Sequence, residues 1–191
     1  MKELRKVSQK ELNEILELHK LWLETEGEEG TQADLSYCDL RCTDLSYCDL
    51  RSADLTKANL ANADLRNVDL TKANLANADL TKANLAKADL SYADLRYAIL
   101  RYAILRYADL SYCDLTNANL FCAKVDNMIN VENVGTENRV VYYFYKDDRV
   151  ICESFDNTLE EFKKAVTEKY GSDYGSYSIE IEMFEKMKDT K

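Results

Sequence analysis

The side chains that could support catalysis or bind a metal ion are few, and their spacing fits no catalytic or metal-binding motif. The 191-residue chain has one histidine, His19, and six cysteines. A nucleophilic site of the Ser-His-Asp or Cys-His type would have to use His19, which lies on the apolar stripe of a predicted helix. Neither a Cys-x-x-Cys pair nor a glycine-rich phosphate loop is present. We therefore predict no catalytic residue, no metal site and no cofactor.

Aspartate is abundant, but its regular spacing indicates a structural repeat and not an active site. Residues 33–125 contain twelve Asp and no Glu. One row recurs at intervals of twenty residues: Asp49, Asp69, Asp89 and Asp109. Such a row could bind cations weakly, but solvation beside Lys and Arg neighbours is the simpler interpretation. An enzyme would also need a pocket with perturbed titrating groups around His19 or Cys152, and the sequence indicates none.

The dominant pattern is a leucine at every fifth position from Leu35 to Leu120, with Val125 at the next position. The residue two before each leucine is small, and the residue just before it is usually Asp or Asn. A period of five fits neither a helix nor a strand. In an extended chain Ala53 and Leu55 would point one way and Asp54 the other, so the next two residues must turn. Because one such unit cannot bury its leucine alone, the units must wind and stack into a solenoid.

These tandem Ala-(Asp/Asn)-Leu-x-x units resemble the pentapeptide-repeat family. Examples are Ala-Asp-Leu-Thr-Lys at residues 53–57 and Ala-Asn-Leu-Ala-Asn at residues 73–77. The resemblance covers about half the chain. It implies a mainly β fold, a right-handed quadrilateral β-helix with four units per coil. Residues 33–126 would then hold about nineteen units in just under five coils, forming a rod roughly 20–25 Å long.

Two segments without the repeat flank the solenoid, and we expect them to cover its open strand edges. Residues 1–32 contain a capping box that begins at Ser8, followed by an apolar stripe of helical spacing. This pattern predicts an N-terminal capping helix over about residues 8–24, with His19 packed in it. Residues 127–191 predict a small α+β cap, with a β-hairpin at about 139–155 and helices at about 159–170 and 177–188. An independent C-terminal domain is the alternative.

The net charge of −10 is distributed unevenly along the chain. Residues 1–32 carry −3, residues 33–125 carry −1 and residues 126–191 carry −6. Some pentapeptide-repeat proteins mimic DNA and bind a type II topoisomerase, DNA gyrase. Such a mimic should be strongly negative, because DNA carries a charge about every 1.7 Å of its axis. The nearly neutral rod therefore makes gyrase modulation the alternative, and the acidic pI argues against direct nucleic-acid binding.

One coil departs from the generic repeat, and we call residues 92–112 the tyrosine coil. Tyrosine fills the second turn position of five consecutive repeats: Tyr92, Tyr97, Tyr102, Tyr107 and Tyr112. In the same coil Ile99 and Ile104 replace the outward Asp, and Arg101 and Arg106 follow them. Tyr, Arg and an exposed aliphatic anchor are typical of interface hot spots. Two alternatives stay open: either tyrosine simply stacks well between sheet rungs, or the C-terminal segment covers the isoleucines.

These features predict a non-catalytic protein–protein interaction or scaffold protein of unknown partner. We expect a bacterial, cytoplasmic protein, because there is no apolar run of membrane-spanning length and no signal-peptide core. The cysteines agree with this compartment, since Cys38, Cys48 and Cys113 occupy the small inward position as free thiols. We also predict that the protein is a monomer or a weak dimer and that it does not bind a membrane.

Overall fold

The computed structural model describes residues 4–126, 128–134, 139–144, 149–152, 155–171, 177, 181–182 and 184–186. The chain divides into two compact units, Met1–Asp126 and Asn127–Lys191. None of the helices in the described ranges is long and apolar enough to cross a membrane.

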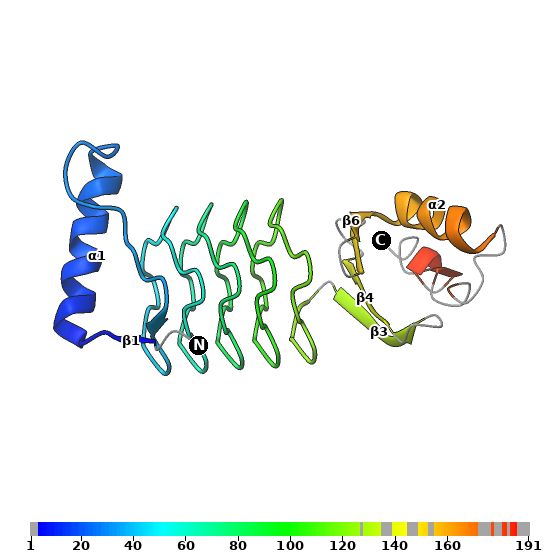
Figure 1. Ribbon diagram of the computed structural model, residues 1–191, viewed down its shortest axis with the longest axis horizontal. Helices are drawn as coiled ribbons and strands as arrows, with labels where there is room; N and C mark the ends of the chain where they lie inside the picture. Colours follow the sequence, from blue (N-terminus) through cyan, green and yellow to red (C-terminus); the bar gives the residue numbers. More distant parts are fainter. Residues whose placement is uncertain are drawn as a thin grey trace. The chain divides into compact units, whose positions relative to one another are not determined.

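The first unit contains a stack of coils in which residues twenty apart pair in parallel (Figure 1). The pairs run without a change of register from Asp34 with Asp54 to Ile104 with Lys124. Each pair is held by backbone bonds in both directions, such as Leu35 N to Asp54 O at 2.7 Å and Asp54 N to Ala33 O at 2.9 Å. Because the repeat is five residues long, each coil contains four repeats. The fold is therefore a β-helix, as the repeat predicts.

Every repeat turns through a residue with a left-handed backbone. At eighteen positions from Tyr37 to Cys122, φ lies between 54° and 62°. A bond such as Ala58 N to Leu55 O, at 3.0 Å, closes each turn. A turn of this kind favours Gly or Asn at the left-handed position, and other residues are destabilised there by roughly 1–2 kcal/mol. The bond that this residue's amide donates to the next coil, as from Lys57 N to Ala76 O at 3.0 Å, helps to offset the cost.

Leucine and a small residue fill the interior of the coils. Leu55, Leu75 and Leu95 are fully buried, and so are the small residues two positions before them. Successive coils lie about 4.8 Å apart, so that each leucine packs on the leucine twenty residues away. A second large inward side chain in each repeat would overfill this interior, which explains why the paired position is small.

Two elements precede the repeats: β1 (Arg5–Lys6) and α1 (Gln9–Glu24). The Oγ of Ser8 accepts a hydrogen bond from Glu11 N at 3.2 Å, so Ser8 is the N-cap of α1. α1 lies across the N-terminal end of the stack (Figure 1). The chain leaves it through Gly30, where a Cβ would lie 2.2 Å from the carbonyl oxygen of Leu18. No side chain fits there, so the glycine is required for this exit.

Strand β1 is an element that the sequence pattern does not predict. It pairs in parallel with β2 (Cys38–Asp39), with Arg5 opposite Cys38. The guanidinium of Arg5 donates to the thiol sulfur of Cys38 at 3.2 and 3.3 Å and to the carbonyl of Asp34 at 3.1 Å. The N-terminal segment therefore continues the parallel pairing of the first coil before α1 begins.

The second unit is an antiparallel sheet with a helix. Its strands are β3 (Met128–Val134), β4 (Arg139–Phe144), β5 (Arg149–Cys152) and β6 (Phe155–Thr158), in the order β3-β4-β5-β6. Thr158 caps α2 (Leu159–Tyr170), because its side chain accepts from Glu161 N at 3.3 Å. Val141, Tyr143, Phe162, Ile181 and Phe184 belong to one buried cluster, which joins the sheet to α2.

This unit differs from the predicted hairpin in two ways. β3 was not predicted, and the strand expected to run to Phe155 is two strands, with Cys152 paired opposite Phe155. Residues 149–155 resemble one strand in sequence, because they contain strand-forming Val150, Ile151 and Phe155 and no Gly, Pro, Asn or Asp to mark a break. Of the helix predicted over about 177–188, residues 181–182 and 184–186 are helical. The remainder of that prediction, Tyr177 excepted, lies outside the described residues.

Candidate functional site

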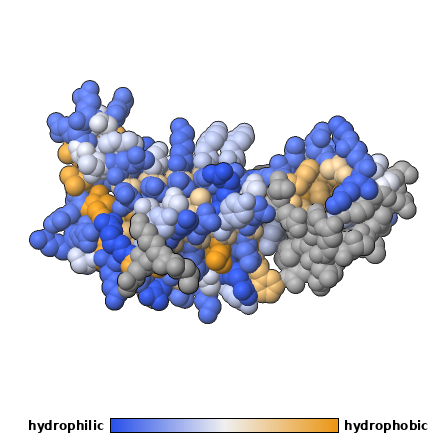
Figure 2. Space-filling view, in the orientation of Figure 1, coloured by the Kyte–Doolittle hydropathy of each residue, from blue (hydrophilic) through white to orange (hydrophobic). Residues whose placement is uncertain are grey.

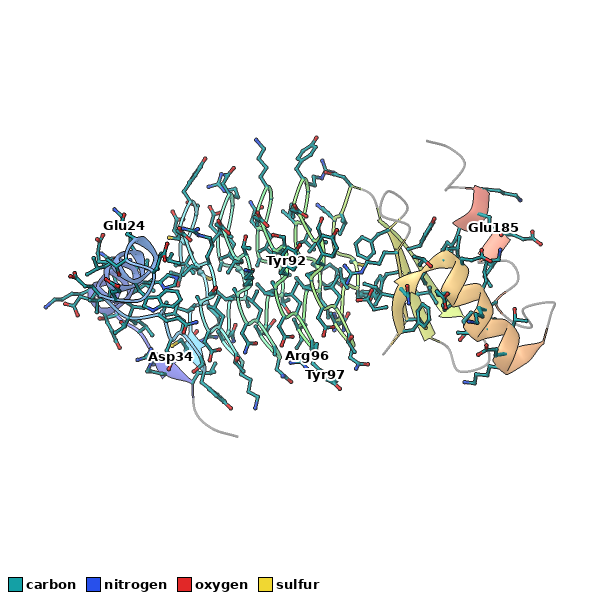
Figure 3. The ribbon with its side chains drawn as sticks, turned by 90° about the horizontal axis from the view of Figure 1, so that it is seen from above. Glu24, Asp34, Tyr92, Arg96, Tyr97 and Glu185 are labelled. Carbon is teal, nitrogen blue, oxygen red and sulfur yellow. The ribbon has the colours of Figure 1, made fainter. Side chains whose placement is uncertain are left out.

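The tyrosine coil places its aromatic residues on the outside of the solenoid. Each tyrosine occupies the left-handed turn position. The exposed fractions are 55% for Tyr92, 57% for Tyr97, 44% for Tyr102, 76% for Tyr107 and 77% for Tyr112. Ile99 is 38% exposed, Ile104 is partly buried, and Arg101 and Arg106 are exposed. In Figure 3, Arg96 and Tyr97 project from a turn into solvent. Hydrophilic residues cover most of the described surface on the face that Figure 2 shows.

The coil does not present all its predicted residues in one direction, because its tyrosines lie at successive turns. Tyr92 and Tyr112 share a turn and stack with ring centroids 4.9 Å apart, which confirms the predicted stacking of residues twenty apart. At another turn, Tyr102 packs edge-on against Phe121 at 5.8 Å. The guanidinium carbon of Arg101 lies 5.3 Å from the Phe121 centroid and 5.7 Å from that of Tyr102. Phe121 was not predicted, although it stands twenty residues after Arg101.

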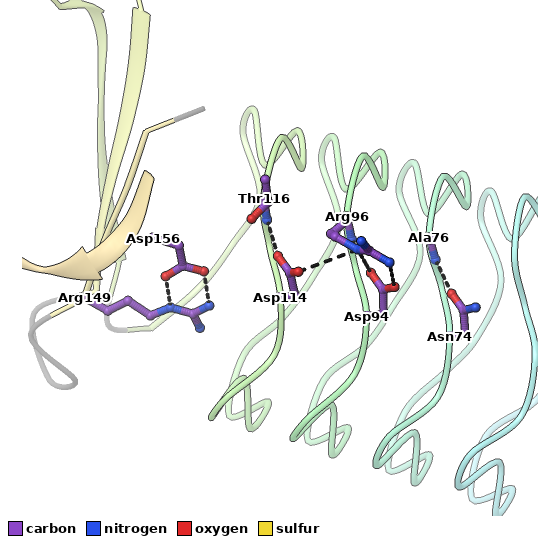
Figure 4. Close-up of polar contacts among 8 residues, drawn as sticks. All are labelled: Asn74, Ala76, Asp94, Arg96, Asp114, Thr116, Arg149 and Asp156. Carbon is purple, nitrogen blue, oxygen red and sulfur yellow. Dashed lines mark hydrogen bonds and ion pairs between the residues drawn. The ribbon is translucent and has the colours of Figure 1, made fainter. Parts of the chain in front are cut away.

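The outward Asp and Asn side chains have a structural role that the repeat pattern alone did not reveal. Their Oδ1 accepts a hydrogen bond from the backbone amide two residues later (Figure 4). The distance is 3.1 Å from Ala76 N to Asn74 and 2.9 Å from Thr116 N to Asp114. Such Asx turns prepare the chain for the corner of each repeat. The aspartate rows are therefore turn-forming residues, and the described residues contain no group of ligands able to hold a metal ion.

Arginines in the solenoid follow a pairing rule that the tyrosine coil breaks. Where the sequence is Asp-Leu-Arg, the guanidinium forms two bonds to the carboxylate two residues earlier, as from Arg96 to Asp94 at 2.9 and 2.6 Å (Figure 4). The bonds from Arg96 lower the pKa of Asp94. The other three pairs are Arg41 with Asp39, Arg51 with Asp49 and Arg66 with Asp64.

At Arg101 and Arg106 the residue two positions earlier is Ile99 or Ile104. These two guanidiniums therefore lack the carboxylate that neutralises the other four solenoid arginines. Neither forms an ion pair within the described part of the chain. The same replacement removes the Asx acceptor from the amides of both arginines. Ile99 and Ile104 thus give up a structural interaction and leave two cations exposed.

His19, the one candidate for acid–base chemistry, is a buried packing residue. Its Nδ1 accepts a hydrogen bond from Ala33 N at 3.0 Å, and its ring stacks on Trp22 at 5.7 Å. The side chain is fully buried, and Nε2 has no hydrogen-bond partner among the described atoms. Burial lowers the pKa of His19, against a smaller raising effect of Asp49. The imidazole connects α1 to the first repeat and has no access to a substrate.

We expect acidification through pH ~6.5 to loosen α1 from the first coil, since 6.5 is the ordinary pKa of histidine. His19 is neutral in the folded state, so below that pH the unfolded state binds more protons and stability falls. The loss is at most about 1.4 kcal/mol per pH unit. Trp22 is the single tryptophan, so its fluorescence against pH reports the contact. His19→Asn keeps an acceptor for Ala33 N. An unchanged fluorescence transition in that variant would refute the assignment to His19.

The five-residue repeat and the coil-to-coil pairing define a repeat β-helix. The family model for pentapeptide repeats matches the chain in eight copies, over residues 31–63, 48–85 and 83–120. Residues 31–120, a little under half of the chain, therefore consist of pentapeptide repeats. The match describes a structural repeat.

Solved structures of pentapeptide-repeat proteins are similar to about half of this chain. HetL from Nostoc sp. strain PCC 7120, involved in heterocyst differentiation regulation, is 39% identical over 50% of this chain and 44% of its own, with a TM-score of 0.41. A protein of the Arabidopsis thaliana thylakoid lumen is 30% identical over 49% of this chain and 65% of its own, with a TM-score of 0.47. The chain therefore spans less than two thirds of either protein.

A third similar structure is trypsin-treated QnrB1, a plasmid-mediated fluoroquinolone resistance protein. It is 21% identical over 53% of this chain and 68% of its own, with a TM-score of 0.27. No curated protein matches the chain.

Proposed function

We propose that this protein is a non-catalytic interaction or scaffold protein that binds a protein partner through its tyrosine coil. The observation that carries the proposal is Ile99, a large aliphatic side chain 38% exposed at a position that holds Asp or Asn in most other repeats. Exposed tyrosines lie along the same coil, together with two arginines that form no ion pair with any residue the structure describes. A coil that gives up turn-forming carboxylates for apolar and cationic groups is suited to contact another surface.

Turn geometry does not account for the five tyrosines, which also supports this proposal. A left-handed turn residue is best supplied by Gly or Asn. The same position holds Asn62, Asn67, Asn77 and Asn117 in other repeats, all with φ between 55° and 60°. Tyrosine gains nothing over Asn in backbone energy there. Its large, rigid and amphipathic ring is instead a frequent component of protein interfaces.

The finer architecture that we propose is a right-handed, four-sided β-helix with a cap at each end. Pairing of residues twenty apart and a turn in every fifth residue support four sides. The N-terminal cap would be α1, through its buried Leu12 and His19 and the bond from Thr31 N to Leu18 O at 3.1 Å. For the C-terminal cap we propose residues 127–191, because the last coil needs cover for its strand edges.

Modulation of DNA gyrase by DNA mimicry ranks second. Its support is the family resemblance alone, and the charge of the repeats opposes it. Besides the net charge of −1 over residues 33–125, Arg side chains bond directly to Asp39, Asp49, Asp64 and Asp94. Paired carboxylates imitate a phosphate backbone poorly, because the neighbouring cation cancels their field. A cytoplasmic setting is also proposed, supported by six cysteines that are all free thiols in the described part of the chain.

The experiment is affinity capture from the native host with wild type, Tyr102→Asn/Tyr107→Asn and Tyr47→Asn. Asn suits the left-handed turn, so all three should fold. Tyr47 is 76% exposed in the same turn position but lies outside the tyrosine coil, which makes it the control. We expect the double variant to lose a partner that wild type and the control retain. Equal capture by all three would refute the site, and gyrase subunits among the captured proteins would favour the alternative.

A further inference from the structure

The tyrosine coil contributes to a surface with an unusual excess of positive charge. We define the cationic face as three stacked segments, residues 81–87, 101–107 and 121–126. It carries five cations, Lys82, Lys87, Arg101, Arg106 and Lys124, and one carboxylate, Asp126. The corresponding segments nearer the N-terminus, residues 41–47 and 61–67, carry two cations and two carboxylates. The excess therefore belongs to the end of the solenoid that includes the tyrosine coil, in a chain whose net charge is −10.

The five cations of this face have no charge partner in the part of the chain that the structure describes. None forms an ion pair among the residues described, and all five are exposed. The single carboxylate is already engaged, since Asp126 Oδ2 accepts a hydrogen bond from Tyr107 N at 2.8 Å. The next carboxylates, Asp89 and Asp109, belong to the side that follows the turn. An arginine fork is best satisfied by a carboxylate or phosphate that accepts two bonds at once.

Apolar groups lie between these cations. Ile104 stands in the sequence between Arg101 and Arg106, and Arg101 lies against the rings of Tyr102 and Phe121. A face of three coils measures about 10 Å along the stack, and one side is about 16 Å across. That area suits a short extended segment with a few carboxylates and not a nucleic acid, which needs contacts to several phosphates. The overall negative charge also repels a polyanion at long range.

We propose that the cationic face binds an acidic segment of a protein partner, in which an apolar side chain lies between carboxylates. This inference rests on the proposed interaction function and specifies its partner. Carboxylates would form paired bonds to Arg101 and Arg106, while the apolar side chain packs on Ile104 and Tyr102. Both arginines are available to bind a partner because isoleucine stands where other repeats have aspartate. The loss of one internal ion pair in each of these two repeats leaves a guanidinium that can recognise a carboxylate.

The test is fluorescence anisotropy with a short fluorescein-labelled peptide of repeated Glu-Glu-Leu. Controls for ligand class are the Gln-Gln-Leu peptide, an oligothymidylate and phosphatidylserine vesicles. Arg101→Gln/Arg106→Gln should lower the affinity about tenfold or more, because each arginine loses a charge-assisted contact. Arg41→Gln/Arg66→Gln removes the same charge from the same two turns, which flank this side in earlier coils. It should change the affinity less than about twofold, since those arginines are already paired. Added salt should weaken wild-type binding.

Equal effects of the two arginine pairs would overturn the inference, as would binding of the Glu-Glu-Leu peptide that matches the Gln-Gln-Leu control. Arginine-dependent binding of oligothymidylate or vesicles in place of the peptide would overturn the choice of partner. The captured native partner separates this inference from the proposed function. A partner lost by Tyr102→Asn/Tyr107→Asn but kept by Arg101→Gln/Arg106→Gln would leave the interaction function standing and refute the acidic segment.

Discussion

Ile99→Asp/Ile104→Asp should abolish partner binding while raising the thermal stability of the solenoid. Each new carboxylate would accept the amide two residues later, as Asp94 does from Arg96 N at 3.0 Å. A net hydrogen bond of this kind contributes about 0.5–1.5 kcal/mol. Each would also pair with the arginine two residues later. The substitution thus restores the rule that the other Asp-Leu-Arg repeats follow.

The same two changes damage the proposed surface in two ways. They replace apolar anchors by carboxylates, and they occupy the guanidiniums of Arg101 and Arg106 internally. The loss of two hot-spot side chains reduces affinity by about 100-fold or more. We therefore expect the substitution to raise stability and to lower affinity, because isoleucines suited to binding stand where other repeats have stabilising aspartates.

Thermal unfolding followed by circular dichroism, together with capture of the native partner, measures both effects. Asn59→Asp/Asn74→Asp is the matched control, since it adds the same two carboxylates at the same repeat position in earlier coils. It should keep the partner, and its stability should change little because Asn59 and Asn74 already accept the turn bond. A double isoleucine variant that unfolds at a lower temperature than wild type would contradict the turn argument.

Leu80→Ala should destabilise the solenoid by about 2–5 kcal/mol, the usual cost of such a cavity in a core. Leu80 is fully buried. Its backbone is fixed by the bond from its amide to Ile99 O at 2.8 Å, while the following residues pair with both neighbouring coils. A coil that is hydrogen-bonded to both neighbouring coils cannot collapse into the cavity left by the missing side chain. We therefore expect a destabilisation in the upper part of this range.

Denaturant unfolding gives the free energy directly, with Leu18→Ala as the comparison. Leu18 lies on α1 and is 46% exposed, so its truncation should cost little. The two variants remove the same atoms, so the difference between their free energies of unfolding reports the contribution of burial. Similar destabilisation by both would mean that the leucine column is not the main source of stability in this unit.

The solenoid was predictable because its signal is long and redundant. A leucine at every fifth position excludes helix and strand periods, and stacking at twenty residues is enough to place Tyr92 against Tyr112. Strand β1 was not predictable, since Arg5 and Lys6 are exposed and carry no alternation. The left-handed backbone of the turns was not predicted, because Tyr, Lys and Cys, which occupy many of them, have no preference for positive φ.

The candidate site was predicted less completely. The tyrosines, isoleucines and arginines of the coil were named from departures in the repeat. The pairing of each solenoid arginine with an aspartate two residues earlier was not recognised, because the outward aspartates were interpreted as solvated carboxylates. An Asp two residues before each paired Arg is visible in the sequence, and Asx-turn chemistry would have explained both. The position of Phe121 beside Arg101 also follows from the twenty-residue stacking and was overlooked.

The uniform twenty-residue register has a consequence for how the length of this protein can change. Removal of residues 58–77 would join Lys57 to Ala78 and delete one full coil, so every later side chain would keep its direction. Removal of five residues would preserve the repeat equally well but would turn everything after it by one side of the solenoid. Gain or loss of whole coils can therefore alter the distance between α1 and the tyrosine coil without reorienting that coil, whereas gain or loss of single repeats points it at a different neighbour.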